Sequence, residues 1–355
     1  MKWLISSLAL MACLLQPVRA RADVDLLVFP ELRLAYEDGD RLTDPAVTPS
    51  LDLFFTAHKG RLKLLVETLA EEDDVSAERL QLGYEPAPGT SIWLGRIHNP
   101  LGYWITRYHH GTYLQPSISR PASAEFDHDG GPFPGHLVGL LFTTEQLFGP
   151  ASLDYNLAVG AGPELRAEAG SGADERFLLH SIDLLKPNTG RHGVNVTARV
   201  SYRPDATADD AVSVFGSYVR VPVDNPAYDP VDLVITGLSV HTELDFTTLT
   251  GSLFVSGDHV QGDKGRGWRR FVTGYLHADL PLNSAVSAFV RFEHSWSYRD
   301  DPYVNLLQGF IPKRHVLGLC WDFNLGQALK LEYSRNQRQG HSFWQTLVNW
   351  SAVFP

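Results

Sequence analysis

Apolar and polar side chains alternate along sixteen segments of this chain. In one segment Val286, Ala288 and Val290 share one side, while Ser287 and Arg291 share the other. A period of two places neighbouring side chains on opposite faces of a β-strand. Most segments run about nine to twelve residues, the length that a tilted strand needs to cross a bilayer, whereas soluble strands more often have about five or six. The pattern predicts an all-β chain whose strands cross a membrane.

The sixteen predicted strands lie near residues 26–37, 49–58, 60–70, 78–86, 90–97, 136–144, 151–161, 192–203, 211–221, 232–245, 248–260, 269–280, 284–297, 314–324, 327–336 and 342–354. Segment 176–184 is a further candidate strand and raises the alternative count to eighteen. Gly and Pro flank it on both sides, so we expect it to remain in a long connection.

The predicted faces have an unusual polarity. In segment 327–336, Leu329 and Leu331 oppose Lys330 and Glu332, and the other segments repeat this separation of apolar from charged residues. A soluble barrel would bury its apolar side. Lipid outside and water inside explain the opposite arrangement, so we expect a closed transmembrane antiparallel β-barrel. Aromatic residues at predicted strand ends are expected to form interfacial girdles: Tyr36, Tyr84, Tyr155, Tyr202, Trp296, Trp321, Tyr333 and Trp350.

Short and long connections alternate between these strands. Short links at 59–60, 86–89, 246–247, 281–283 and 324–326 are expected on the periplasmic side. Longer polar links near 38–48, 71–77, 98–135, 162–191, 222–231, 261–268, 298–313 and 337–341 are expected to face outward from the cell. The final segment, 342–354, should pair with the first strand and close the barrel without an exposed edge.

The N-terminal residues have the pattern of an export signal. Lys2 precedes an apolar run from Trp3 to Leu15, and Ala20-Arg21-Ala22 provides a cleavage site. We expect residues 1–22 to be a signal peptide and 23–355 to be a single outer-membrane barrel domain. A lipoprotein attached through Cys13 is the alternative, disfavoured because the apolar run continues past that residue.

Charge and cysteine content restrict the partners. The chain carries a net charge of −11, and removal of the three bases before residue 23 would leave 27 bases against 41 acids, or −14. This disfavours nucleic acid as a partner. Cys320 would be the one cysteine left, so no intramolecular disulfide is expected. The expected partners are outer-membrane lipid and small hydrophilic solutes, and no cofactor is expected.

The longest connection, 98–135, follows the fifth predicted strand. With this topology the chain resembles the general porins of Gram-negative bacteria, whose third external loop folds into the barrel and narrows the pore. The resemblance spans the whole mature chain and rests on topology, with no shared sequence motif. It implies a passive channel and a homotrimer. The last strand also resembles the assembly signal of outer-membrane barrels, although Phe354 is followed by Pro355.

Candidate site residues come from this loop and from the inward strand faces. For the pore constriction we expect His98, Tyr103, Trp104, Arg107, His109, His110, Arg120, Asp127 and Asp129. For the lumen wall we expect Arg61, Lys63, Arg79, Arg199, Arg291, Glu293 and Lys330. Charged side chains around a pore select ions electrostatically.

Other readings of the same residues remain open. A metal site would use His98, His109, His110 and His128 with Asp127 or Asp129, although their spacing matches no common ligand pattern. Stacking of Tyr103, Trp104, Tyr108 and Tyr113 on sugars would give a sugar-selective porin, and lumen arginines would favour phosphate or other anions. No hydrolase motif such as Gly-x-Ser-x-Gly occurs, so we expect no enzyme. A non-conducting barrel that encloses a partner protein is the structural alternative to a channel.

Overall fold

The barrel predicted from alternation is present in the chain. The computed structural model describes residues 23–38, 46–71, 74–108, 111–125, 127, 130–167, 177–186, 190–260, 267–307, 309–338 and 340–355. The predicted signal peptide, residues 1–22, lies outside the described residues. No helix in the described part of the chain has the length and apolar character needed to cross a membrane.

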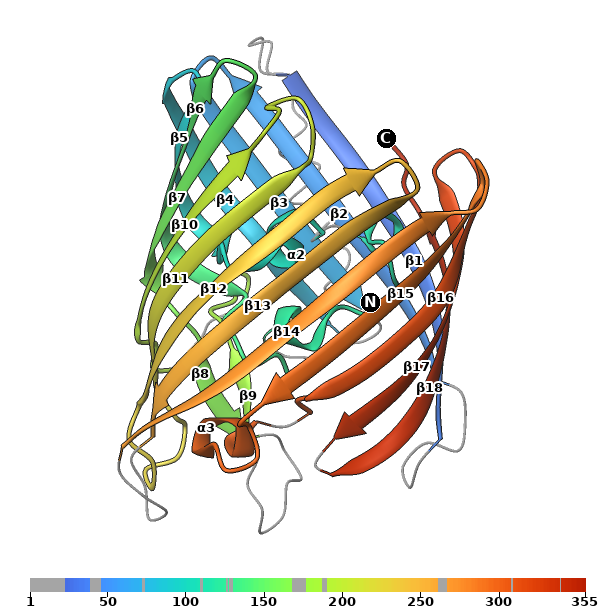
Figure 1. The fold of residues 1–355 in the computed structure, drawn as a ribbon. Coiled ribbons are helices and arrows are strands. Elements are labelled where there is room, and N and C mark those ends of the chain that lie inside the picture. The colour runs from blue at the N-terminus through green and yellow to red at the C-terminus, as the bar shows by residue number, and fades with distance from the viewer. Residues whose placement is uncertain are drawn as a thin grey trace.

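Sixteen antiparallel strands form one closed barrel. They are β1 (Asp23–Asp38), β2 (Ala46–Lys59), β3 (Leu62–Glu71), β4 (Val75–Ala87), β5 (Thr90–His98), β6 (His136–Phe148), β7 (Ala151–Ala161), β10 (Val194–Arg203), β11 (Ala211–Val221), β12 (Val231–Leu244), β13 (Thr247–His259), β14 (Trp268–Pro281), β15 (Val286–Trp296), β16 (Lys313–Asn324), β17 (Gln327–Arg338) and β18 (His341–Ala352). Each pairs with its neighbours in chain order, as Figure 1 shows. The predicted count of sixteen is confirmed.

The barrel closes between its first and last strands. β1 pairs with β18 from Glu31 opposite Ser351 to Asp38 opposite Trp344. Beyond this ladder, the Val28 amide donates to the Phe354 carbonyl at 2.9 Å. The prediction that 342–354 pairs with the first strand is therefore confirmed, and the ring leaves no free edge.

The two remaining strands are not part of the wall. β8 (Glu164–Ala167) and β9 (Phe177–His180) form a separate two-stranded sheet within the long connection from β7 to β10, joined to other loops by single bridges from Leu165 to Val223 and from Phe177 to Leu307. Segment 176–184 thus contributes a strand to a loop hairpin, and the alternative count of eighteen barrel strands is wrong.

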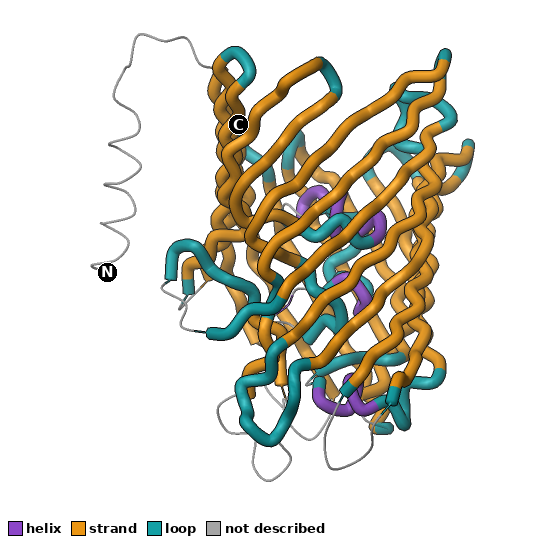
Figure 2. The backbone as a smooth tube through the Cα atoms, turned by 90° about the vertical axis from the view of Figure 1, so that its left-hand side faces the viewer, coloured by secondary structure: helices purple, strands orange, loops and turns teal. Residues whose placement is uncertain are grey.

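Connections at the two ends of the barrel differ in length (Figure 2). We call the end with links such as 60–61, 88–89 and 325–326 the turn end, and the opposite end the loop end. Two links predicted to be long, near 71–77 and 337–341, are short. β3 and β17 continue to Glu71 and Arg338, because hairpin pairing satisfies the backbone groups up to those residues.

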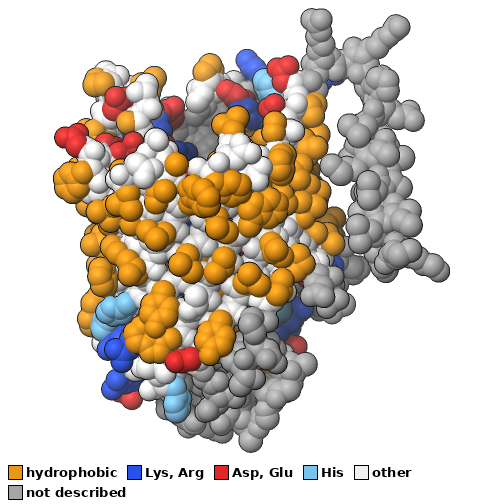
Figure 3. Space-filling model, turned by 90° about the vertical axis from the view of Figure 1, so that its right-hand side faces the viewer, with side chains coloured by type: hydrophobic (Ala, Val, Ile, Leu, Met, Phe, Trp, Pro, Cys, Tyr) orange, Lys and Arg blue, Asp and Glu red, His pale blue; other side chains and the backbone are white. Residues whose placement is uncertain are grey.

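The outer face is apolar and much of the inner face is polar. On β17, Leu331 and Tyr333 are each 47% exposed, whereas Lys330 and Glu332 are at most 1% exposed. Figure 3 shows the resulting apolar belt on the outer wall. Six of the eight predicted girdle aromatics are exposed large side chains: Tyr36, Tyr84, Tyr202, Trp296, Trp321 and Tyr333.

One inner wall departs from the predicted polarity. At the loop end of β11–β14 many of the inward side chains are apolar, and Val219, Leu233 and Ile235 are fully buried, although Ser256 and Asp258 of β13 are buried there too. They pack with the β8–β9 hairpin, with the 99–135 connection and with helix α3 (Pro302–Leu306). The loops that fold onto this inner wall of β11–β14 exclude water from that side of the barrel interior, and we call it the dry wall.

Candidate functional site

The connection 99–135 lies inside the ring of strands. Its helix α2 (Gly102–Arg107) contacts β11–β13, its turn η1 (Thr112–Leu114) contacts β1 and β18, and its turn η2 (Ala122–Ala124) contacts β14. Contacts with opposite walls place this segment, here called the crossing loop, across the lumen (Figure 2).

Aromatic residues anchor the first part of the crossing loop. Trp104 is fully buried, with its ring edge-on to Tyr275 at 5.8 Å and to His277 at 5.5 Å between centroids. Tyr103 stacks on His241 with centroids 4.3 Å apart. Residues 102–107 are short for an isolated helix, so tertiary packing supplies most of the stability of α2. Two of the four aromatics considered for sugar stacking are therefore wall anchors.

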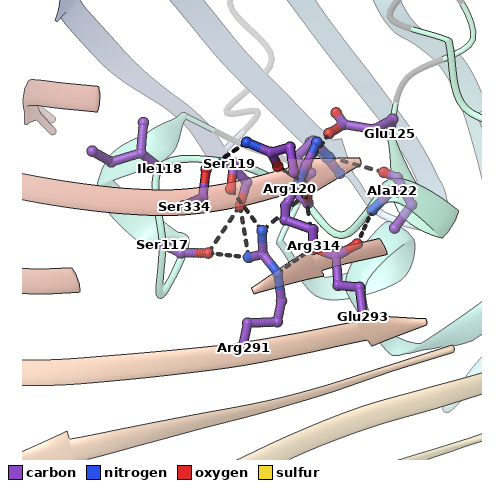
Figure 4. Close-up of polar contacts among 12 residues, drawn as sticks. Ser117, Ile118, Ser119, Arg120, Ala122, Glu125, Arg291, Glu293, Arg314 and Ser334 are labelled. Atoms are coloured by element: carbon purple, nitrogen blue, oxygen red, sulfur yellow. Dashed lines mark hydrogen bonds and ion pairs between the residues drawn. The ribbon is translucent and has the colours of Figure 1, made fainter. Parts of the chain in front are cut away.

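An arginine from the wall holds the middle of the crossing loop (Figure 4). The fully buried Arg291 donates to Ser117 Oγ at 2.6 Å, to the Ser119 carbonyl at 2.9 Å and to Ser119 Oγ at 2.6 Å. It also donates to the Arg120 carbonyl at 3.2 Å and to Glu293 Oε1 at 2.8 Å. Five acceptors compensate the guanidinium for its lost hydration.

Carboxylates complete this anchor by accepting from the loop backbone. Glu332 Oε2 accepts from the amides of Ile118 and Ser119, each at 3.0 Å. Glu293 Oε2 accepts from the Ala122 amide at 2.6 Å. Such charge-assisted hydrogen bonds are stronger than neutral ones, and they satisfy amides that the irregular loop leaves without partners.

Two more basic residues of the wall bind loop carbonyls. Lys330, which is 1% exposed, donates to the carbonyls of Thr112 and Gln115. Arg314 donates to the Arg120 carbonyl at 2.6 Å and to Glu125 at 3.2 Å. Arg291, Glu293 and Lys330 thus face inward as the alternation implies, but their polar atoms are engaged by the crossing loop.

A buried histidine and two carboxylates hold the last part of the crossing loop. His136 lies between Asp127 of the loop, at 3.1 Å from Nδ1, and Glu78 of β4, at 3.2 Å from Nε2. Ser181 Oγ and the Gly135 amide also donate to Asp127. Burial alone would raise the pKa of Asp127, but these hydrogen bonds outweigh it and hold the pKa below its ordinary value.

Neighbouring charges extend this group along the wall. His98 Nε2 lies 3.8 Å from Glu67 Oε2, to which Arg79 Nε donates at 2.6 Å. Arg96 lies 3.7 Å from Glu78. Glu78, Arg96 and His136 were absent from the sequence-based candidates. The strand register would have identified this group, since His98 and His136 are direct partners at the ends of β5 and β6.

The other predicted residues occupy separate places. Arg199 donates to Thr106 Oγ1 at 2.6 Å, and Arg107 forms an ion pair with Asp209 near the turn end. Arg120 is buried, with Nε donating to the Ala124 carbonyl at 3.1 Å. Lys63 pairs with Glu85 at 2.5 Å. Arg61 is exposed in the 60–61 turn, so its prediction as a wall residue is wrong: β3 begins one residue later.

Three predicted residues, His109, His110 and Asp129, lie outside the described residues. Within the part of the chain that the structure describes, no group of three or more histidine, cysteine or acidic residues is placed to hold a metal ion. His98 and Asp127, the described members of the considered metal site, are engaged by Glu67 and by His136 respectively.

Space remains beside the crossing loop. A cavity of about 480 Å³ separates the loop from β1–β4, and its lining includes the inward carboxylates of Glu31, Asp52, Glu67, Glu71 and Glu78. Arg120, Arg314 and Arg338 line it as well, from the loop and from β16 and β17. A second cavity of about 310 Å³ shares Leu69, Glu71 and Glu78 with the first and extends to the β8–β9 hairpin. We call the first space the acidic cavity.

Comparison with known proteins shows similarity in structure but not in sequence. No family model matches the chain, and no curated protein matches it in sequence. In vitro folded OmpT, an outer membrane protein of Vibrio cholerae, is 9% identical over 96% of this chain and 99% of its own, with a TM-score of 0.59. Salmonella typhi OmpF in complex with daunomycin is 12% identical over 95% and 99%, also at 0.59. A mutant porin of Rh. blastica is 11% identical over 94% and 100%, at 0.50. The chain therefore has the sixteen-stranded barrel fold of the outer-membrane porins.

Proposed function

We propose that this chain is an outer-membrane channel through which small hydrophilic solutes and ions diffuse passively, without a chemical step. The observation that carries the proposal is the acidic cavity: beside the crossing loop the barrel retains a space of about 480 Å³ lined by charged groups. On the opposite side of the lumen, apolar side chains of β11–β14 and of the loops fill the space, so the proposed route follows β1–β5. The crossing loop is the constriction in this proposal.

The charges beside this route favour cations weakly. Six acids and four arginines line the acidic cavity, and this excess of negative charge raises the local concentration of cations. Anion or sugar selectivity is the alternative outcome of the same measurements. No catalytic role is proposed for any residue.

Two lining residues of opposite charge provide a matched test of selectivity. Glu71→Gln should shift the reversal potential in a salt gradient toward anions, and Arg33→Gln should shift it toward cations. A unit charge about 8 Å from a permeating ion contributes ~0.5 kcal/mol in water, about a twofold change in the permeability ratio. Planar-bilayer recordings of single channels measure both. Shifts of the same sign, or no shift in either variant, would show that ions do not pass through the acidic cavity.

A cysteine introduced into the acidic cavity tests the route directly. Ser50 lines this space, so Ser50→Cys followed by a cationic methanethiosulfonate reagent should reduce single-channel conductance by a large fraction. Ser342→Cys, at an exposed position near the loop end, is the control and should leave conductance unchanged. Equal responses of the two variants would contradict the proposed route.

The non-conducting scaffold remains a second candidate because of the apolar core inside the barrel. Loops already fill the β11–β14 side of the lumen, as a barrel without a transport role would require. Correctly folded protein that gives no stable conductance steps in planar bilayers would favour the scaffold and contradict the channel.

Location and assembly follow from the same proposal. The apolar outer belt suits lipid, and residues 1–22 would direct export to the outer membrane of a Gram-negative cell. One comparison structure of Vibrio cholerae OmpT is described as a trimer form, and we propose a homotrimer here by analogy. Crosslinking of the folded protein in detergent measures the oligomeric state.

A further inference from the structure

Basic side chains gather on the outer wall at the loop end of four neighbouring strands. Each is exposed or half-buried and alternates with residues that are buried inside the barrel. They are Arg270 of β14, His294 of β15, Lys313 and His315 of β16, and Arg335 of β17. We call this group the basic patch. Figure 3 shows His, Lys and Arg side chains at the lower end of the outer wall, next to the apolar belt.

Strand register makes four of these residues neighbours, whereas Arg270 lies beyond the paired part of β14 and β15. His294 pairs with Lys313, and His315 pairs with Arg335. Lys313 and Arg335, which carry permanent charges, are diagonal neighbours across β16 and β17, and like charges this close repel each other unless an anion lies between them. Among the described residues, no carboxylate lies within ion-pair distance of Arg270, Lys313 or Arg335. The arrangement thus concentrates positive charge without neutralising it.

Aromatic residues lie beside and between the members of the basic patch. Tyr333, two residues from Arg335, stacks on Trp344 with centroids 5.0 Å apart, and the Arg335 guanidinium lies 5.4 Å from the same Trp344 ring. Trp296 lies 4.5 Å from the His294 ring. Tryptophan and tyrosine occupy the interface between hydrocarbon and headgroups, so the basic residues stand at headgroup level.

The charge is confined to one arc of the barrel. The outward residues at the loop ends of β2, β4, β6 and β10 are Val47, Val75, Val138 and Val194. On β11, Arg220 lies 3.4 Å from Asp232 and is therefore neutralised within the wall. A general requirement for solubility at the rim would have placed basic residues around the whole circumference.

A shallow groove lies at the edge of the basic patch that is nearest the loop end. It has a volume of about 290 Å³, and its lining contains Lys313, His294 and Arg299, with Asp300 as the acid. Together with Arg270 it extends the positive surface beyond the end of β15. Lipid chains on the apolar belt would place a phosphate group beside these residues.

We propose that the basic patch binds the phosphate groups of a phosphorylated glycolipid in the leaflet at the loop end, because its basic residues spread over four strands and can contact more than one phosphate. Lys313 and Arg335 would contact phosphate, His294 and His315 would donate further hydrogen bonds, and the acyl chains would lie over Phe292, Leu317 and Tyr333. This site is on the opposite side of the wall from the acidic cavity, so it does not depend on the proposed channel.

Binding to lipid of stated composition tests the site. Detergent-solubilised folded protein would be titrated with diphosphoryl lipid A, with its monophosphoryl form and with phosphatidylcholine, and the complexes counted by native mass spectrometry. The triple variant Arg270→Gln, Lys313→Gln, Arg335→Gln should bind the diphosphoryl lipid about 100-fold more weakly, from the contribution of each basic residue near an anionic surface. Inorganic phosphate at millimolar concentration should compete poorly, because it lacks the chains.

A second triple variant removes the same charge elsewhere. Lys59→Gln and Arg61→Gln lie at exposed positions at the turn end, and Arg220→Gln lies on β11 beside Asp232. This triple variant should reduce binding by less than about twofold, because two of its residues face the other leaflet and the third is already paired with a carboxylate. Equal losses in the two triples, full competition by phosphate, or unchanged binding in the patch triple would each overturn the proposal. If the patch triple does not fold, Lys313→Gln and Arg335→Gln singly provide the same comparison. Both triples should keep wild-type conductance, whichever result the channel tests give.

Discussion

Replacing Arg291 with alanine should destabilise the barrel by about 3–5 kcal/mol, the usual cost of removing one partner from a buried charged pair. The substitution leaves Glu293 buried and removes the donor from four acceptors of the crossing loop. The loop should then leave its position in part of the population, so single-channel conductance should rise and become noisier. Urea unfolding of protein folded into lipid vesicles measures the first effect, and planar-bilayer recording measures the second.

Arg220→Ala is the matched control for that variant. Arg220 also lies near a carboxylate on the wall, but half of its side chain is exposed, and pairs of this kind contribute at most about 1 kcal/mol. Its conductance should equal that of the wild type. A stable Arg291→Ala barrel with unchanged conductance would contradict the assignment of Arg291 as the anchor of the crossing loop.

Replacing Trp104 with alanine should cost a similar amount, about 3–5 kcal/mol, because a fully buried indole leaves a cavity that the surrounding strands cannot fill. Trp104 contacts Tyr275 and His277 on β14 and Tyr108 within the loop. Its loss should free α2 from the wall. The same urea titration measures the change, with near-ultraviolet circular dichroism reporting the loss of aromatic packing.

Trp268→Ala is the comparison variant. Because Trp268 is 59% exposed on the outer wall, its replacement should lower the free energy of unfolding much less. The two anchors also touch: the Arg291 guanidinium lies 5.5 Å from the Trp104 ring. The Arg291→Ala, Trp104→Ala double variant should therefore lose less stability than the sum of the single losses, because each single variant already removes the favourable contact between the two side chains. Full additivity would show that the two anchors act independently.

Alternation predicted the wall well because it reports directly on which solvent each face meets. β10 separates apolar from polar residues at every position and β17 does so from Leu329 to Ser334, and the order of the strands, their count and the closure by β18 follow from this pattern. The alternation pattern also shows why the dry wall was not predicted. Val231-Asp232-Leu233-Val234-Ile235 is apolar on both faces apart from Asp232, and a strand apolar on both faces is buried on both.

The crossing loop was located from its length, but its contacts were not predictable from local sequence. Residues 111–125 are held by side chains from β1 and from β15–β17, which lie up to 218 positions away in the chain. Nothing in a single sequence states that Lys330 will meet the Thr112 carbonyl. The histidine–carboxylate group was missed because the register of β5 and β6 decides it.

The distance along the chain between the crossing loop and its anchors has a temporal consequence. Strands β15–β17, which bind most of residues 112–125, lie near the C-terminal end of the chain and are synthesised late. Until these strands are in place, Arg291, Glu332 and Lys330 cannot bind the loop backbone, and β1 and β2 hold it only near Gly111 and Thr112. Final placement of the crossing loop should therefore be coupled to completion of the C-terminal part of the barrel.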